Sequence, residues 1–297
     1  MKANKIIINW LLLLSLILLW GTSFLFTALA VATIDPLSIV FYRVLIGAIV
    51  LTVYLYFRRK KLPREIKSWL IFLLFGFVGN LLPFFLIAWG QQTIDSGLAG
   101  MIMAIMPLIT MILAHYFIRG ESLSLFKILG FLLGITGVSI LLGPVFRGST
   151  LEMLSAIAVL TAACSYAVNT ILVRRLPRFD PVVAGAGLLI AASLALLIPW
   201  ILLTTPVTAA VSPTSIISLI WLGIGPTGIA TIILFVVIER AGPTFLSTIN
   251  YLIPVVAFFT GVFFLNESLS WMSLLALIII ILGISLSRLG ADHNARV

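Results

Sequence analysis

WGQQTIDSGLAGMIMAIMPLITMILAHYFIRGESLSLFKILGFLLGITGVSILL, residues 89–142, is the stretch that decides the fold. It reads as an apolar helix with Pro107 inside it, a polar turn with Glu-Ser-Leu-Ser at 121–124, and a second apolar helix. Half a chain later the pattern returns, with Pro254 in an apolar run, Glu-Ser-Leu-Ser at 267–270 and the apolar run 274–286. An internal repeat of this kind indicates duplication. The stretch therefore predicts a duplicated membrane protein.

The composition excludes an ordinary soluble domain. Of the 297 residues, 62% are hydrophobic and 9% are charged, whereas soluble domains carry about a quarter charged residues. The mean hydropathy is +1.27, and uncharged runs of about 20 residues recur along the chain, which indicates several membrane-spanning helices. The net charge of +9 does not indicate nucleic-acid binding, because the basic residues sit in short clusters between apolar runs. The single cysteine, Cys164, excludes an intramolecular disulfide and a multi-cysteine metal site, and no metal site is expected.

The breaks between apolar runs predict ten helices. They carry proline, glycine or charge, and Asp35-Pro36 and Asp180-Pro181 mark equivalent places in two halves. A signal peptide is the alternative for the first helix, but its apolar stretch continues to about Thr33, which is too long for a signal core. The expected helices are 7–32, 36–57, 67–91, 96–118, 123–143, 151–173, 181–204, 214–238, 243–265 and 270–288.

The basic residues fix the expected orientation. If the N-terminus is cytoplasmic, all of the 18 basic residues except Arg43 and Arg147 fall on the cytoplasmic side, as the positive-inside rule requires. Because each half has an odd number of helices, five, the halves are then inverted. We expect a first repeat at 7–143, a second at 151–288 and a cytoplasmic tail at 289–297, with both termini cytoplasmic. Inverted repeats are a recurring architecture of secondary transporters, which bind substrate between the halves near the middle of the membrane.

At this point the chain resembles a known family, the EamA-type branch of the drug/metabolite transporter superfamily. The resemblance rests on Leu-Trp-Gly-Thr-Ser-Phe at 19–24, Phe41-x-Arg43, and the two units Pro107–Glu121 and Pro254–Glu267. It covers about residues 8–288. It implies a ten-helix transporter of small metabolites, and within the family an exporter of amino acids or related solutes. An exporter of drugs or other amphipathic metabolites is the alternative.

Polar and aromatic side chains near helix middles are the candidates for a substrate site, because polar groups inside a membrane tend to face protein or water. The repeat alignment pairs Asn80 with Thr227 and Phe84 with Thr231, and spacing i, i+4 places each set on one helix face. The alternative role of each residue is a hydrogen bond between helices. The candidates are Trp20, Ser23, Phe24, Asn80, Phe84, Tyr166, Asn169, Thr227, Thr231, Asn250 and Tyr251.

Arg43, Pro107 and Pro254 are candidates for other roles. Arg43 lies inside the second helix and its repeat counterpart is the apolar Leu188, so it either reaches out to the headgroups, caps carbonyls of a neighbouring helix, or meets a substrate carboxylate. Pro107 and Pro254 occupy equivalent positions and weaken their helices, either as hinges that let the halves open or as static kinks.

The rival classes lack the residues they need. The only histidines are His115 and His293, so no triad or histidine-rich centre can be assembled, which argues against a membrane enzyme. No acidic residue sits at a helix centre, which favours downhill transport, or a coupling that the sequence does not reveal. We expect no cofactor, partners limited to a small-molecule substrate and the lipid bilayer, no nucleic acid, and a monomer or homodimer. The compact form without an organellar presequence predicts the bacterial inner membrane.

Overall fold

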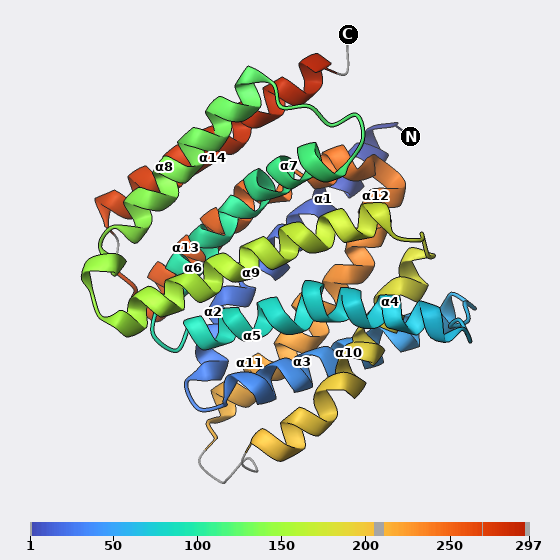
Figure 1. Cartoon of the computed structure of the whole chain (residues 1–297). Helices are drawn as coiled ribbons and strands as arrows, with labels where there is room; N and C mark the ends of the chain where they lie inside the picture. The colour runs from blue at the N-terminus through green and yellow to red at the C-terminus, as the bar shows by residue number, and fades with distance from the viewer. Residues whose placement is uncertain (1, 205–210, 269, 295–297) are drawn as a thin grey trace.

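The computed structural model of the chain describes residues 2–204, 211–268 and 270–294, and these residues form a bundle of helices without a strand (Figure 1). Eight helical segments are long and apolar enough to cross a membrane, and the shorter apolar helices Ile249–Leu265 and Trp271–Ser287 follow them. The predicted all-α membrane fold is therefore confirmed.

The first half contains five membrane-length segments. The first segment consists of α1 (Lys2–Gly21) and α2 (Ser23–Val31), and the second is α3 (Pro36–Phe57). The third consists of α4 (Ile66–Gly76), η1 (Phe77–Leu81) and α5 (Leu82–Gly90). The fourth consists of α6 (Ser96–Ile102), η2 (Met103–Ile105) and α7 (Met106–Phe117), and the fifth is α8 (Leu125–Leu142). The short η3 (Val145–Arg147) leads to the second half.

The second half repeats this order. It comprises α9 (Thr150–Arg175), α10 (Pro181–Leu203), α11 (Pro213–Leu222) with η4 (Gly223–Ile229) and α12 (Ala230–Leu246), then α13 (Ile249–Leu265) and α14 (Trp271–Asn294). The repeated Asp-Pro markers start equivalent helices. Asp35 accepts a hydrogen bond from the backbone N–H of Ser38, and Asp180 accepts from Val182 and Val183, while each proline occupies the first turn, where its missing N–H costs nothing.

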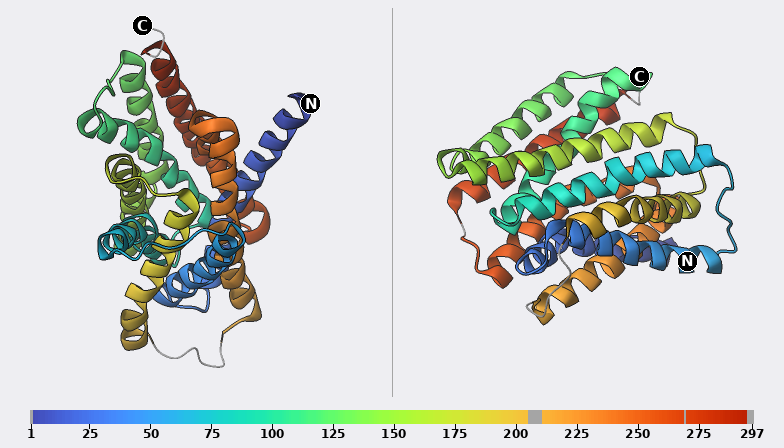
Figure 2. Two further views of the ribbon diagram at one scale, coloured as in Figure 1. Left: turned by 90° about the vertical axis from the view of Figure 1, so that its right-hand side faces the viewer. Right: turned by 60° about the horizontal axis from the view of Figure 1, so that its bottom comes forward.

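Repeat-equivalent helices pack against each other in antiparallel directions. In the pair α8 and α14, which lies at one edge of the molecule (Figures 1 and 2), Gly130 lies against Gly283 and Ser287, whereas Gly137 lies against Ala276 and Ile280. The pairs α6 with α13 and α3 with α10 run antiparallel as well. Ser96 lies near Gly261 and Gly100 near Ala257 in the first pair, and Gly47 lies near Leu189 and Leu51 near Gly185 in the second. The remaining contacts come in matching sets, since α1 packs on α13 as α9 packs on α7. Antiparallel packing of equivalent helices confirms that the halves are inverted.

Three expected helices differ from the structure in their course. The first is divided at Thr22, whose hydroxyl donates to the Leu18 carbonyl (2.6 Å) in addition to the regular bond from its backbone N–H (3.0 Å). The expected helix 243–265 is interrupted by a turn between Leu246, where α12 ends, and Ile249, where α13 starts, and the chain also kinks just before this helix at Gly242 (φ 82°). The last helix continues to Asn294, beyond the expected end at 288 and into the expected tail.

Candidate functional site

Two π-helical turns at equivalent places in the two halves build the candidate site. η1 contains Asn80 and precedes Pro83, and η4 contains Pro226 and Thr227. A proline has no N–H for the carbonyl one turn earlier, so the helix widens locally and leaves carbonyls for other partners. Asn80 lies in η1 and Phe84 follows in α5, so the two positions are joined through a π turn, and their common helix face stays a prediction.

In η4 the freed backbone is bonded by side chains. The Thr227 hydroxyl donates to the Leu222 carbonyl (2.8 Å), to which Pro226 cannot donate because it has no N–H. The Trp20 indole of α1 donates to the Pro226 carbonyl (2.9 Å). Thr231 donates to the Thr227 carbonyl within the same helix (2.6 Å). Thr227 is buried, and its hydroxyl oxygen still accepts one further bond.

That bond comes from Arg43 on α3. The Arg43 Nε donates to the Thr227 Oγ1 (2.9 Å), and the guanidinium carbon lies 3.7 Å from the centre of the Phe84 ring of α5. This is a cation–π contact between α3 and α5, two helices of the first half. Arg43 is 7% exposed, so its side chain does not reach out to the headgroups. No carboxylate of the described residues lies within 4.0 Å of it.

Helix α9 closes the cluster from the side of η1. The Ser165 hydroxyl donates to the Val78 carbonyl (2.6 Å), which is the counterpart of the bond from Trp20 to η4. The Asn169 amide lies directly against Gly79, where a side chain would collide with it, and its Oδ1 is buried without a hydrogen-bond partner among the described residues. Tyr166, on the same helix, lies within electrostatic reach of Arg43.

We call Arg43, Phe84, Tyr166, Asn169 and Thr227 the Arg43 cluster. It offers a cation, two aromatic rings, an amide and a hydroxyl. Of the remaining candidates, Trp20, Asn80 and Thr231 border it through η1 and η4.

Four candidates lie elsewhere. Phe24 belongs to the hydrophobic core between α6 and α13, and Ser23 donates to the Trp20 carbonyl within its own segment. Asn250 and Tyr251 are half-buried on α13, and Tyr251 packs against the same core as Phe24. Pro107 follows the 3₁₀ turn η2, whereas Pro254 lies inside the uninterrupted α13, so the two prolines differ in their surroundings.

Three polar contacts between helices were missed by the sequence reasoning. They involve Ser165, Gln91, whose amide donates to the Phe24 carbonyl (3.1 Å), and Glu267, which binds the start of α6. A polar residue inside an apolar run was the available signal for Ser165. For Glu267 the signal was its place in the repeated Glu-Ser-Leu-Ser, which was interpreted as a turn.

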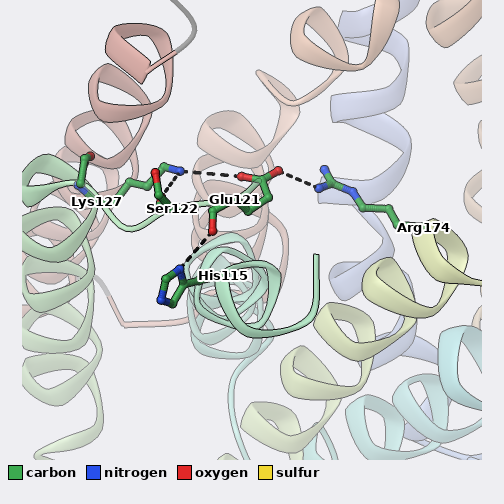
Figure 3. A network of polar contacts seen from close by, with 6 residues as sticks. His115, Glu121, Ser122, Lys127 and Arg174 are labelled. Carbon is green, nitrogen blue, oxygen red and sulfur yellow. Dashed lines mark hydrogen bonds and ion pairs between the residues drawn. The ribbon is translucent and has the colours of Figure 1, made fainter. Parts of the chain in front are cut away.

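The two glutamates of that repeat have different surroundings. Glu121 pairs with Arg174 (3.2 Å) and Lys127 (3.8 Å), its backbone carbonyl lies 3.0 Å from His115 Nδ1, and Figure 3 shows these contacts. Glu267 lines a pocket of about 190 Å³ together with Asp95. Partial burial and the charge of Glu267 raise the pKa of Asp95.

Inverted five-helix halves with a buried polar cluster between α3, α5, α9 and η4 define the class of the protein: a membrane transporter built from inverted repeats. The profile of the EamA-like transporter family matches residues 7–143 and 153–289, and the chain belongs to this family.

Its relatives include transporters by name. The chain is 24% identical to the uncharacterised transporter YoaV of Bacillus subtilis over 92% of this chain and 94% of that protein. It is 27% identical to the uncharacterised inner membrane transporter YedA of Escherichia coli (94% and 90%), and 25% identical to a WAT1-related chloroplastic protein of Arabidopsis thaliana (94% and 69%). A solved structure titled "Crystal structure of protein" superposes with a TM-score of 0.71 at 23% identity, covering 96% of this chain and 98% of the other, which supports the fold.

Proposed function

We propose that the protein carries small metabolites with a carboxylate group, most simply amino acids or related solutes, across the bacterial cytoplasmic membrane by alternating access. The family establishes transport, and the inverted halves provide two arrangements of equal topology that can expose one site to either side. In this proposal the transporter works as an exporter with both termini in the cytoplasm, which follows from the family resemblance and from the distribution of the basic residues. The inner membrane is also the location that the name of YedA gives for that relative.

The observation that carries the substrate class is the buried charge of Arg43. A buried ion costs several kcal/mol unless a counter-ion and hydrogen bonds compensate for it. Thr227 and Phe84 supply neutral partners, and among the described residues no carboxylate supplies the charge. A guanidinium binds a carboxylate through two parallel N–H bonds, so a substrate carboxylate is the partner that suits it best.

The rest of the cluster suits the remainder of an amino acid. The unpaired Asn169 Oδ1 accepts a hydrogen bond, which an ammonium group can donate, and the rings of Phe84 and Tyr166 offer apolar surface. Asn80, Trp20 and Thr231 would complete the wall through the two π turns.

Counterflow in proteoliposomes tests the proposal. Proteoliposomes that contain the purified protein are loaded with one unlabelled amino acid at a time from a panel. Entry of the labelled form of that amino acid is followed with and without a pH gradient. Saturable counterflow of at least one amino acid supports the proposal, and the gradient comparison reports proton coupling. Counterflow of drug-like cations but of no carboxylate-bearing solute would contradict it and favour the amphipathic-drug alternative.

A further inference from the structure

Glu267 ties the end of α13 to the start of the segment Ser96–Phe117. Its carboxylate accepts hydrogen bonds from the backbone N–H groups of Ser96 (2.6 Å) and Gly97 (2.9 Å). These N–H groups belong to the first turn of a helix, which has no internal partners for them and carries a partial positive charge. A negatively charged side chain from another helix therefore holds α6 and α13 together at this end of the molecule.

The backbone is shaped for this contact. Asn266 adopts the left-handed conformation (φ 56°), which ends α13 and turns the chain towards α6. The carboxylate then lies against Gly97 and Gly261. A Cβ at Gly261 would collide with it, and a Cβ at Gly97 would lie only 3.0 Å from its oxygen. The Glu267 carboxylate thus lies between two glycines, and its hydrogen bonds hold α6 close to α13.

Its twin Glu121 has another kind of partner. Glu121 is held by the cations Arg174 and Lys127 (Figure 3). The repeat counterparts of these cations beside Glu267 are the uncharged Leu29 and Ser273. The repeat counterparts of Ser96 and Gly97 are Pro243 and Thr244, directly after the non-helical Gly242, and of these two only Thr244 has a backbone N–H.

Helix packing also differs between the end of the bundle that contains Glu267 and the end that contains Glu121. At the end that contains Glu267, α6 packs against both α2 and α13. At the end that contains Glu121, the counterpart of α6 is the chain after Gly242 in α12, and α12 packs mainly against α1, η4 and α10. The structure is therefore drawn together at the Glu267 end, where the repeat-equivalent glutamate binds a helix start.

We propose that Glu267 and Glu121 are two latches that close alternately. In the conformation described here, Glu267 holds the start of α6 while Arg174 and Lys127 hold Glu121. In the opposite conformation, Glu267 releases Ser96 and Gly97, and Glu121 leaves its cations to accept a hydrogen bond from the backbone N–H of Thr244, just after Gly242. This inference rests on the alternating access of the proposed function, and the two glutamates are positioning residues that do not touch the substrate.

Thiol accessibility at the Glu267 end tests the latch without any substrate. Cys164→Ala removes the native cysteine, and Ser96→Cys places a thiol where the serine is 1% exposed while its hydroxyl has no partner among the described residues. We expect slow labelling by a membrane-impermeant maleimide in this parent. Glu267→Gln should increase the rate about tenfold, as expected for weakening a hydrogen bond to a charged group. Glu267→Asp, which keeps the charge, should retain most of the protection and shows that the site tolerates substitution.

Two variants at the far end complete the design. Arg174→Gln, at a half-exposed side chain, removes the nearer of the two cations that hold Glu121 and should also increase labelling of the Ser96→Cys thiol, although it lies at the other end of the bundle. Glu121→Gln is the matched control and should leave the rate unchanged or lower it. Equal rates in the parent and in both Glu267→Gln and Arg174→Gln would overturn the proposal, and so would an increase in Glu121→Gln. Because this assay needs no solute, a failed transport panel with altered labelling would reject the proposed substrates and leave the latch intact.

Discussion

The Arg43 Nε lies 2.9 Å from the Thr227 Oγ1 and donates a hydrogen bond to it. Thr227 accepts this bond while donating to the Leu222 carbonyl, so one hydroxyl joins the buried cation of α3 to the backbone of η4. The geometry gives Arg43 a fixed direction and leaves further guanidinium N–H groups for a ligand, since the group carries five donors. A local irregularity in one helix therefore positions the charge that the other half of the protein supplies.

Thr227→Val tests this joint. Valine keeps the shape of threonine but removes the bond from Arg43 and the bond to the Leu222 carbonyl. The buried guanidinium then lacks its hydroxyl acceptor. We expect a loss of about 1–3 kcal/mol in unfolding free energy, measured as a lower midpoint of thermal unfolding in detergent. Thr136→Val is the matched control, because Thr136 is exposed and bonds only the Leu132 carbonyl of its own helix. An equal shift in both variants would contradict a special role of Thr227.

The antiparallel contact of α8 with α14 predicts a second stability effect. A Cβ at Gly283 would lie 2.7 Å from the backbone oxygen of Gly130 and from the backbone nitrogen of Gly134. Backbone cannot move aside as the end of a side chain does, so Gly283→Ala should separate the helices and cost about 1–3 kcal/mol of unfolding free energy. Gly143→Ala is the control, since its nearest new contact is 3.4 Å. Thermal unfolding midpoints that are equal in the two variants would show that the close packing is not needed.

Asp95 predicts a pH effect. Burial and the charge of Glu267 raise the pKa of Asp95. The ionised form of Asp95 therefore lowers the free energy of unfolding. Its unfavourable contribution is absent below the pKa of about 3.9 of an unfolded aspartate and is complete once pH exceeds the raised folded pKa. Asp95→Asn should therefore raise the unfolding midpoint at pH 7, and this gain should vanish as pH falls below about 4. Asp95 makes no capping hydrogen bond through its side chain, so Asn removes only the charge. A lower midpoint of the variant at pH 7 would contradict this account.

The two Glu-Ser-Leu-Ser turns predict opposite membrane sides. Ser122 and Ser268 are equivalent and both exposed, so each can carry a cysteine in the Cys164→Ala background. An impermeant maleimide added to intact cells should label Ser268→Cys, and it should label Ser122→Cys only after the cells are opened. Labelling of both in intact cells would contradict the inverted arrangement with a cytoplasmic N-terminus.

The sequence predicts the architecture well because duplication leaves equivalent signals. Asp35 and Asp180, and Glu121 and Glu267, fixed the repeat, and the apolar run lengths fixed the segments. The π turns were not predicted, although Pro83 and Pro226 marked the helices in which they form. Proline shows that a carbonyl is freed, but a free carbonyl can be bonded by a distant donor such as Trp20, and sequence spacing does not show that donor.

The candidate site was predicted in part for a similar physical reason. The structure places Phe84, Tyr166, Asn169 and Thr227 with Arg43 or next to η1, and their contact with substrate stays a prediction. Phe24 belongs to another hydrophobic core, because the side on which a helix presents a residue depends on the rotation and the breaks of that helix. The separate settings of Glu121 and Glu267 were not predicted, although Arg174 and Lys127 have the uncharged repeat counterparts Leu29 and Ser273, because the repeat alignment does not show which side chains meet.

Arg43→Gln in the counterflow assay tests the central claim most directly. Glutamine keeps a hydrogen bond to Thr227 within reach but removes the charge, and the amino acid that gives the strongest counterflow is compared with its decarboxylated amine. The account predicts that wild-type protein exchanges the amino acid and not the amine, and that Arg43→Gln, with an unchanged size-exclusion profile, loses at least about tenfold of the amino-acid rate, since an ion pair of this kind contributes more than 1.4 kcal/mol. Exchange of the amino acid by Arg43→Gln at the wild-type rate would contradict a substrate site at the buried cation.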